Sequence, residues 1–154
     1  MKKIASFTID HTILPKGMYL SRVDANTVTY DIRTRRPNRE DVMDNGGIHT
    51  LEHLFATYVR NSEFSDKIIY FGPMGCRTGF YFITTDTLSK KDAIELTKSA
   101  LAFCADFEGE IPGVSEIECG NYRDHNLESA KDEASAMVTV LKSWTEEMLV
   151  YPTK

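Results

Sequence analysis

Apolar and polar side chains alternate in several short segments of the chain, a pattern typical of strands with one buried face. The alternation is clearest over residues 28–32, and residues 67–71 and 79–84 predict two further strands. Residues 72–75, with two glycines and a proline, predict the turn between these two strands. We expect an additional strand over residues 5–9, which would bring the sheet to about four strands, a usual size.

Three longer segments carry apolar residues every three or four positions and predict helices. The first runs from about residue 48 to 61, and the second from about 89 to 106, where Ser89 followed by Asp92 resembles a helix start. The third runs from about residue 126 to 149. Because strands do not alternate strictly with helices, the order favours an α+β fold, with an antiparallel sheet packed against helices, over a doubly wound parallel sheet.

The size and composition predict one globular domain spanning residues 1–154. The sequence has no internal repeat, low-complexity tract or linker. Its 42% hydrophobic and 27% charged residues are ordinary for such a domain. A chain of this length buries about 70% of its unfolded surface, so disulfides are not needed for stability.

Charge and hydropathy narrow the possible partners. A net charge of −5 argues against non-specific nucleic-acid binding, which needs a basic face. The sequence shows no run of 18 apolar residues and no signal peptide, so we expect no membrane partner and a cytoplasmic location. The odd cysteine count indicates thiols that are free, catalytic or metal-bound rather than paired, at Cys76, Cys104 and Cys119.

The segment His49-Thr50-Leu51-Glu52-His53 is the strongest candidate for chemistry. Two histidines four apart on a helix project from one face, which is metal-site geometry because imidazole is the commonest metal-ligating side chain. Glu52 lies close to that face, where a carboxylate could act as an acid or a base. The simpler alternative is two ordinary histidines on a solvated helix face, since short motifs also occur by chance.

A metal ion would need at least one further ligand. The candidates are His11, His125, the three cysteines and several carboxylates. Cys119 is attractive because it lies in a break, residues 118–121, where a thiolate can point into a cleft. Two imidazoles and a thiolate would leave one position open, as in catalytic sites, and suit Zn(II), while imidazole also suits Fe(II). A small buried side chain is the competing role for Cys119.

Other polar residues carry weaker signals. Cys76 follows the glycine-rich turn, and Arg77 beside it could favour the reactive thiolate, although a strand-end cysteine without function is an equal alternative. Arg33 could clamp a carboxylate, and Arg60 lies two helical turns beyond the histidine pair. Taken singly, these arginines are more simply solvated charges or surface salt bridges. Cys104 lies on an apolar helix stripe, and we assign it no function.

In order and spacing, these segments resemble the S-ribosylhomocysteine lyase (LuxS) family over nearly the whole chain. The most specific are His49-Thr50-Leu51-Glu52-His53 and Pro73-Met74-Gly75-Cys76, which together are far more selective than either alone. The supporting matches are Ser6 to His11, Asp31-Ile32-Arg33, Pro37-Asn38 and Cys119-Gly120. The resemblance implies a small α+β homodimer with its active sites at the subunit interface.

The resemblance also implies an activity. The family cleaves S-ribosylhomocysteine to homocysteine and 4,5-dihydroxy-2,3-pentanedione, the precursor of autoinducer-2, by two aldose–ketose isomerisations and a β-elimination. It implies one Fe(II) per subunit, replaceable by Zn or Co, held by His49, His53 and Cys119 with water in the fourth position. Cys76 and Glu52 match the two general acid/base residues. A role in quorum sensing and a role in recycling a methyl-cycle by-product both stay open.

The same resemblance implies substrate contacts. The matching positions are Ser6, His11, Arg33 and, with a looser match, Arg60. Two positions depart from better-known members of the family. Tyr70 replaces an aspartate that helps to bind the ribose, and Gly72 replaces a serine that several members carry, so the family's details of sugar recognition, unlike its reaction, are not carried over to this chain.

Two other functions compete with the lyase. H-x-x-E-H is also the signature of inverzincin metallopeptidases, but that class needs a downstream carboxylate ligand and gives Cys76 and Cys119 no role. A non-enzymatic metal or redox module would have a site closed by four protein ligands, often with paired cysteines, and the sequence has no C-x-x-C. We therefore expect the lyase.

Overall fold

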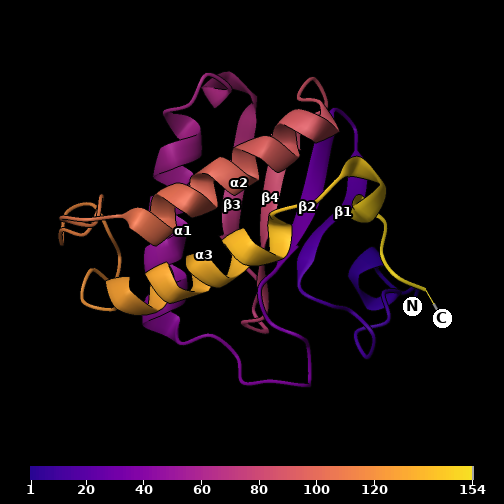
Figure 1. The fold of residues 1–154 in the computed structure, drawn as a ribbon, viewed down its shortest axis with the longest axis horizontal. Helices are drawn as coiled ribbons and strands as arrows, with labels where there is room; N and C mark the ends of the chain where they lie inside the picture. The colour runs from indigo at the N-terminus through magenta and orange to yellow at the C-terminus, as the bar shows by residue number, and fades with distance from the viewer. Residues whose placement is uncertain (154) are drawn as a thin grey trace.

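Four antiparallel strands form one sheet in the order β1-β2-β4-β3 (Figure 1). The computed structural model describes residues 1–153. The strands are β1 (Gly17–Asp24), β2 (Thr27–Arg33), β3 (Ile68–Pro73) and β4 (Gly79–Thr85). One face of the sheet is covered by three helices, α1 (Asn45–Arg60), α2 (Lys90–Asp106) and α3 (Leu127–Leu141). The predicted α+β class and the antiparallel sheet are therefore confirmed.

The helical face of the sheet holds the hydrophobic core. Phe55 of α1 stacks on Phe71 of β3 at a centroid distance of 3.9 Å, and Phe71 stacks on Phe80 of β4 at 4.9 Å. Because side chains alternate along a strand, the polar residues of β2 point to the opposite face. Asp31 and Arg33 are nevertheless buried there, at 0% and 2% exposure. β2 is thus buried on both faces rather than half-buried as predicted.

The predicted N-terminal strand over residues 5–9 is wrong. Ala5–Phe7 forms a short 3-10 turn, and the fourth strand is β1, which the alternation did not indicate. β1 pairs with β2 through a tight turn in which Ala25 has a left-handed φ of 50°. A hairpin between neighbouring segments closes only a short loop, so its entropic cost is small and β1 takes the edge of the sheet.

The last helix is shorter than predicted. α3 ends at Leu141, and a separate 3-10 turn spans Glu146–Leu149. Trp144 turns back toward β1, where its indole Nε1 donates a hydrogen bond to the Met18 carbonyl at 2.8 Å. Leu149 is buried as well. The apolar period beyond Leu141 therefore reflects packing against the edge strand rather than a continuing helix.

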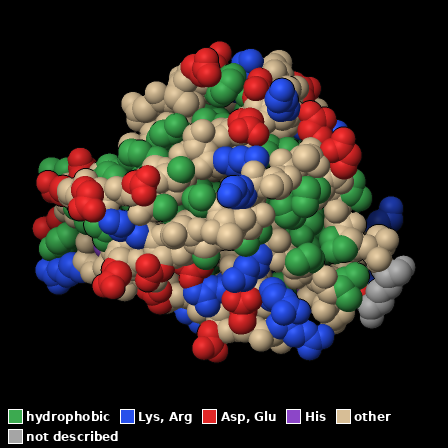
Figure 2. Space-filling model, in the orientation of Figure 1, with side chains coloured by type: hydrophobic (Ala, Val, Ile, Leu, Met, Phe, Trp, Pro, Cys, Tyr) green, Lys and Arg blue, Asp and Glu red, His purple; other side chains and the backbone are tan. Residues whose placement is uncertain are grey.

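The outer side of the helical layer is charged. Figure 2 shows acidic and basic side chains interspersed over it, with apolar surface between them. Among residues 1–153, no helix is both long and apolar enough to cross a membrane.

Candidate functional site

One face of α1 carries two histidines that meet a cysteine from the connection between α2 and α3. His49 and His53 lie one helical turn apart with nearly perpendicular rings, whose centroids are 4.7 Å apart. Cys119 Sγ lies 3.3 Å from His49 Nε2 and 4.0 Å from His53 Nε2. The structure therefore brings together the three side chains that we expected to bind a metal ion.

Backbone carbonyl groups orient both imidazoles. His49 Nδ1 donates to the Asp124 carbonyl at 2.9 Å, and His53 Nδ1 donates to the Pro112 carbonyl at 2.8 Å. A carbonyl oxygen only accepts, so each Nδ1 carries the proton and each Nε2 keeps its lone pair free. Gly113, at a left-handed φ of 70°, lets the connection pass close to the His53 ring, where a Cβ would be crowded.

The arrangement of these donors fits a metal ion. The ligand atoms of the cluster all lie within 4.8 Å of one another. Two neutral imidazoles and one thiolate suit Zn(II) or Fe(II) and leave a fourth position open. The hydrogen bonds at both Nδ1 atoms are those that usually surround metal-binding histidines.

His125 is a fourth member of the cluster, and the sequence left it open as a ligand. Its ring stacks on His49 at a centroid distance of 3.9 Å and an angle of 24°. Because the lone pair of an imidazole lies in the ring plane, two stacked rings do not direct their lone pairs at one ion. His125 Nδ1 instead lies 2.9 Å from Thr50 Oγ1. Burial, together with His49 and His53, lowers the pKa of His125 to about 4, so this ring is neutral near pH 7.

A second group of predicted residues lines a cavity of about 380 Å³ at the face of the sheet opposite the helices. Four of them lie together there, namely Ser6, His11, Arg33 and Cys76. Cys76 is exposed, and its Sγ lies 3.0 Å from Thr78 Oγ1 and 4.0 Å from Arg33 Nη1. This cavity thus combines a thiol, a hydroxyl, an imidazole and a guanidinium.

The arginine next to Cys76 in sequence is not the one next to it in space. Arg77 Nη1 lies 3.5 Å from the Met43 carbonyl. Arg33 reaches the thiol from β2 instead. The structure therefore gives Arg33 the role of neighbouring charge that we had expected of Arg77.

Glu52 and Arg60 lie apart from this cavity. Glu52 is half-buried on α1, between the two histidines in sequence. Arg60 is exposed at the end of α1, where its Nη2 donates to the Ile69 carbonyl at 2.9 Å. Neither residue lines the cavity that contains Cys76, and none of the three candidate metal ligands does.

The two positions that depart from the family pattern are neighbours in space. The side chain of Tyr70 lies over Gly72, and a Cβ at residue 72 would overlap the Tyr70 ring and hydroxyl. Tyr70 is 47% exposed. The absence of a side chain at residue 72 is therefore what allows Tyr70 to lie across the strand.

Three polar residues near Cys76 were missed from the sequence. Tyr81 lines the cavity, Asp31 pairs with Arg33 at 2.6 Å, and Tyr151 donates to Asp31 at 2.7 Å. Alternation along the strands could have placed Asp31 and Tyr81 on the same face as Arg33. No local pattern points to Tyr151, because its contact is formed across the fold.

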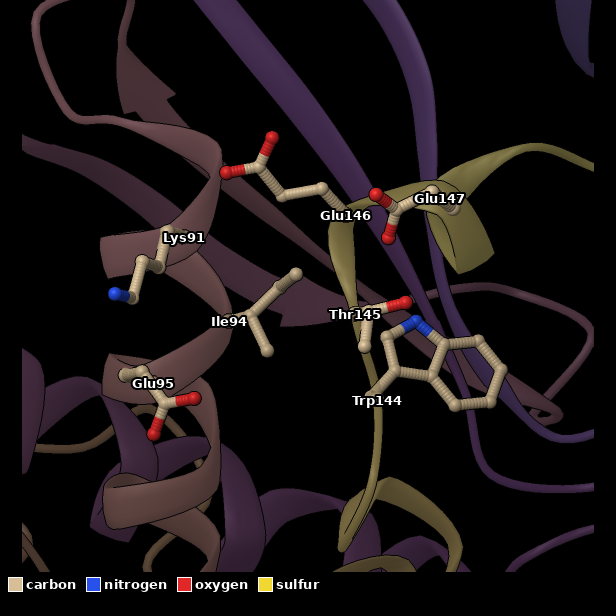
Figure 3. Close-up of a pocket in the computed structure, with 7 residues that line it drawn as sticks. All are labelled: Lys91, Ile94, Glu95, Trp144, Thr145, Glu146 and Glu147. Atoms are coloured by element: carbon tan, nitrogen blue, oxygen red, sulfur yellow. The ribbon is translucent and has the colours of Figure 1, made fainter.

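A separate cavity of about 420 Å³ lies between α2 and the segment that follows α3 (Figure 3). It is lined by Lys91, Ile94, Glu95 and residues 144–147. None of the predicted site residues contributes to it. This cavity therefore shares no lining residue with the cavity at Cys76 and contains none of the three candidate metal ligands.

Comparison with known proteins agrees with this arrangement of residues. Residues 4–148 match the model of the S-ribosylhomocysteinase (LuxS) family. The S-ribosylhomocysteine lyase of Borrelia garinii is 50% identical over 157 residues, covering 99% of this chain and 100% of the relative. The lyases of Phocaeicola vulgatus and Desulfotalea psychrophila are 48% and 47% identical, and each alignment covers at least 99% of both chains. The chain therefore belongs to the S-ribosylhomocysteinase (LuxS) family.

Proposed function

We propose that this chain cleaves the carbon–sulfur bond of S-ribosylhomocysteine and releases homocysteine and 4,5-dihydroxy-2,3-pentanedione, the autoinducer-2 precursor. As a member of its family it is a lyase, and the relatives named above are S-ribosylhomocysteine lyases. The observation that carries the proposal is the convergence of His49, His53 and Cys119, because two imidazoles and a thiolate form an open metal site.

We assign one Fe(II) per chain to His49, His53 and Cys119, with Zn or Co as substitutes. When bound, the ion would supply Lewis acidity to adjacent oxygens of the sugar. The carbonyl groups of Pro112 and Asp124 contribute by keeping both imidazoles in the tautomer that offers Nε2.

Cleavage requires protons to move between neighbouring sugar carbons. The carbonyl shifts from C1 to C2 and then to C3, after which a proton leaves C4 and the thiolate leaves C5. We assign these proton transfers to Cys76 and Glu52. Arg33 Nη1, 4.0 Å from Cys76 Sγ, favours the thiolate that a base at this position needs. General acid–base catalysis of this kind typically contributes about 10²–10⁴-fold.

Substrate binding is assigned to the polar residues around Cys76. Ser6, His11 and Arg33 line the same cavity as the thiol, so they can hold a sugar against it. Arg60 is proposed as a further contact because its guanidinium is exposed. Tyr70, whose ring covers Gly72, offers a hydroxyl where the family usually offers a carboxylate.

The division of these residues between two places supports a homodimer with interfacial active sites. The metal ligands and Glu52 belong to α1 and the α2–α3 connection, whereas Cys76 lines a cavity without them. Apolar side chains are exposed at the N-terminal segment beside that cavity, with Phe7 at 68% and Ile4 at 55%. A second copy would cover this surface and bring its metal ligands to Cys76.

Two broader assignments follow from the chemistry. All three cysteines are free thiols, which supports a cytoplasmic location because that compartment keeps thiols reduced. A metallopeptidase is not favoured, because a thiol rather than a carboxylate completes the histidine pair. The proposed substrate is a small molecule, with no role for nucleic acid or membrane.

Release of thiol from S-ribosylhomocysteine tests the proposal. The anaerobically purified protein, loaded with Fe or Co, is incubated with the substrate, and free homocysteine is titrated. We expect release that falls by about 10² or more in Cys76→Ala at full metal content. Cys104→Ala, which changes a buried cysteine on α2, should retain activity. No thiol with either metal would contradict the proposal, and peptide cleavage would favour the metallopeptidase.

A further inference from the structure

A chain of polar contacts runs from the C-terminal segment to the reactive thiol. The Tyr151 hydroxyl donates to Asp31 Oδ2 at 2.7 Å. Arg33 donates to both oxygens of the same carboxylate, from Nε at 3.1 Å and from Nη2 at 2.6 Å. The remaining nitrogen, Nη1, donates to Thr78 Oγ1 at 2.8 Å and lies 4.0 Å from Cys76 Sγ. Each group therefore holds the next one in place.

Burial makes these contacts strong. Asp31 is 0% exposed and Arg33 is 2% exposed, so water screens their charges little. A hydrogen bond donated to Asp31 polarises the carboxylate toward the donor. It thereby weakens the attraction between this carboxylate and the Arg33 guanidinium. The Tyr151 hydroxyl thus leaves more of the positive field of Arg33 for Thr78 and Cys76.

Tyr151 is itself held in position. Its ring stacks on Tyr19 at a centroid distance of 5.1 Å and an angle of 18°, and the Tyr19 hydroxyl donates to the Pro15 carbonyl at 3.0 Å. Burial and the Asp31 carboxylate raise the pKa of Tyr151 far above its usual range. The hydroxyl is therefore neutral near pH 7 and can donate to Asp31.

Within residues 1–153, the titratable groups that line the cavity of the thiol besides Arg33 are His11 and Tyr81. His11 from the N-terminal segment and Tyr81 from β4 line its cavity, and burial with Asp31 raises the pKa of Tyr81, so Tyr81 is uncharged near pH 7. Arg77 is directed toward the Met43 carbonyl. Arg33 is thus the main permanent charge acting on Cys76.

We propose that Tyr151 is a positioning residue for Cys76, acting through Asp31 and Arg33 to favour the thiolate. This rests on the proposed acid/base role of Cys76, but the thiolate can be measured without turnover. Tyr151 follows the 3-10 turn at Glu146–Leu149, so this segment helps to position the groups around Cys76 in addition to packing against β1.

The test is the rate at which iodoacetamide alkylates Cys76 as a function of pH. The protein is used with metal bound, which protects Cys119, while Cys104 is buried, and mass spectrometry confirms the modified residue. In Tyr151→Phe we expect the midpoint of the pH–rate profile for alkylation of Cys76 to move to higher pH. The alkylation rate at pH 7 should fall by about threefold, because only the thiolate reacts.

Tyr19→Phe is the matched control, since it removes from the same aromatic stack a hydroxyl that donates to the Pro15 carbonyl rather than to Asp31. Its alkylation profile should equal that of the unmodified protein. An unchanged profile in Tyr151→Phe, or equal shifts in both variants, would overturn the proposal. Lyase turnover is measured separately, so an altered profile in a protein without turnover would contradict the proposed function and not the role of Tyr151.

Discussion

Thr50 determines which role the His125 imidazole can take. Its hydroxyl accepts a hydrogen bond from the Asn126 amide at 3.0 Å and can therefore donate its own proton to His125 Nδ1. The ring proton of His125 then sits on Nε2, a buried atom with no partner among residues 1–153. At His49 and His53 the backbone carbonyl groups impose the opposite tautomer. One cluster thus contains two imidazoles suited to bind metal and one suited to donate a hydrogen bond.

Replacing Thr50 with valine should destabilise the fold while sparing metal binding. The change keeps the shape of the side chain but leaves His125 Nδ1 without its partner, while the Asn126 amide keeps only its hydrogen bond to the Gly46 carbonyl, a loss of about 1–3 kcal/mol. Thr97→Val is the matched control, because Thr97 is equally buried and its hydroxyl has no partner within residues 1–153. Urea unfolding should show a lower free energy of unfolding for Thr50→Val only. Metal analysis should find one metal ion per chain in both variants. Equal stabilities would contradict this account.

At the scale of elements, one carboxylate joins the starts of two helices. Asp44 caps α1 by accepting a hydrogen bond from the Gly47 amide at 2.8 Å, and it also accepts one from the Ser129 hydroxyl in α3. The first turn of α1 contains Gly46 and Gly47, which are poor helix formers. The cap therefore stabilises the turn that precedes His49, and it ties the metal-binding face of α1 to α3.

Removing this cap should cost stability in a pH-dependent way. Burial raises the pKa of Asp44, but the hydrogen bonds from Ser129 and Gly47 outweigh burial and leave it below the usual 3.8. The stabilisation is therefore fully present above that value and is lost as the pH falls below it. We expect Asp44→Ala to lose about 1–2 kcal/mol at pH 7 and progressively less under acid conditions.

Ser89→Ala provides the comparison for that experiment. Ser89 caps α2 through a hydrogen bond from the Asp92 amide at 3.0 Å, and its hydroxyl does not titrate in this range. Its loss should cost about 1 kcal/mol at every pH measured. Chemical denaturation measures the free energy of unfolding of each variant as a function of pH. If both variants lose stability with the same pH dependence, the explanation given for Asp44 is wrong.

At the scale of the molecule, the sheet separates two sets of functional groups. The metal cluster is built on α1 and on the connection between α2 and α3, while the Cys76 cavity opens beside β2 and β4 on the opposite face. Residues from the N-terminal segment complete the cavity. Neither set by itself brings both the metal ligands and Cys76 to one substrate, which is the physical reason for expecting a second copy.

Mixed dimers test this division directly. Cys76→Ala and Glu52→Gln should each be inactive alone, but a mixed dimer contains one site with both residues intact if the site is shared between chains. Statistical mixing would then restore about a quarter of the unmodified activity. The pair Cys76→Ala and His11→Ala, both in one cavity, should restore none. Failure of the first pair to restore activity would contradict interfacial sites.

Local pattern was sufficient for most of the secondary structure. Alternation and helical period depend on neighbours a few residues apart, so the strands β2, β3 and β4 and the helices α1 and α2 were placed within a few residues. The N-terminal strand and the end of α3 were misplaced because both depend on contacts with β1. Trp144, for example, leaves the helix to reach Met18, which is 126 residues earlier.

The sequence by itself determined the histidine pair, since a spacing of four on a helix puts both rings on one face. It did not determine what completes the site. Cys119 lies 66 residues beyond His53, and His125 stayed open as a candidate until the stacking of its ring was known. Likewise Arg33 rather than Arg77 reaches Cys76, and Tyr151 reaches Asp31 from the end of the chain. Only the tertiary structure decided these contacts between residues far apart in sequence, because the convergence of distant side chains depends on how the whole chain packs.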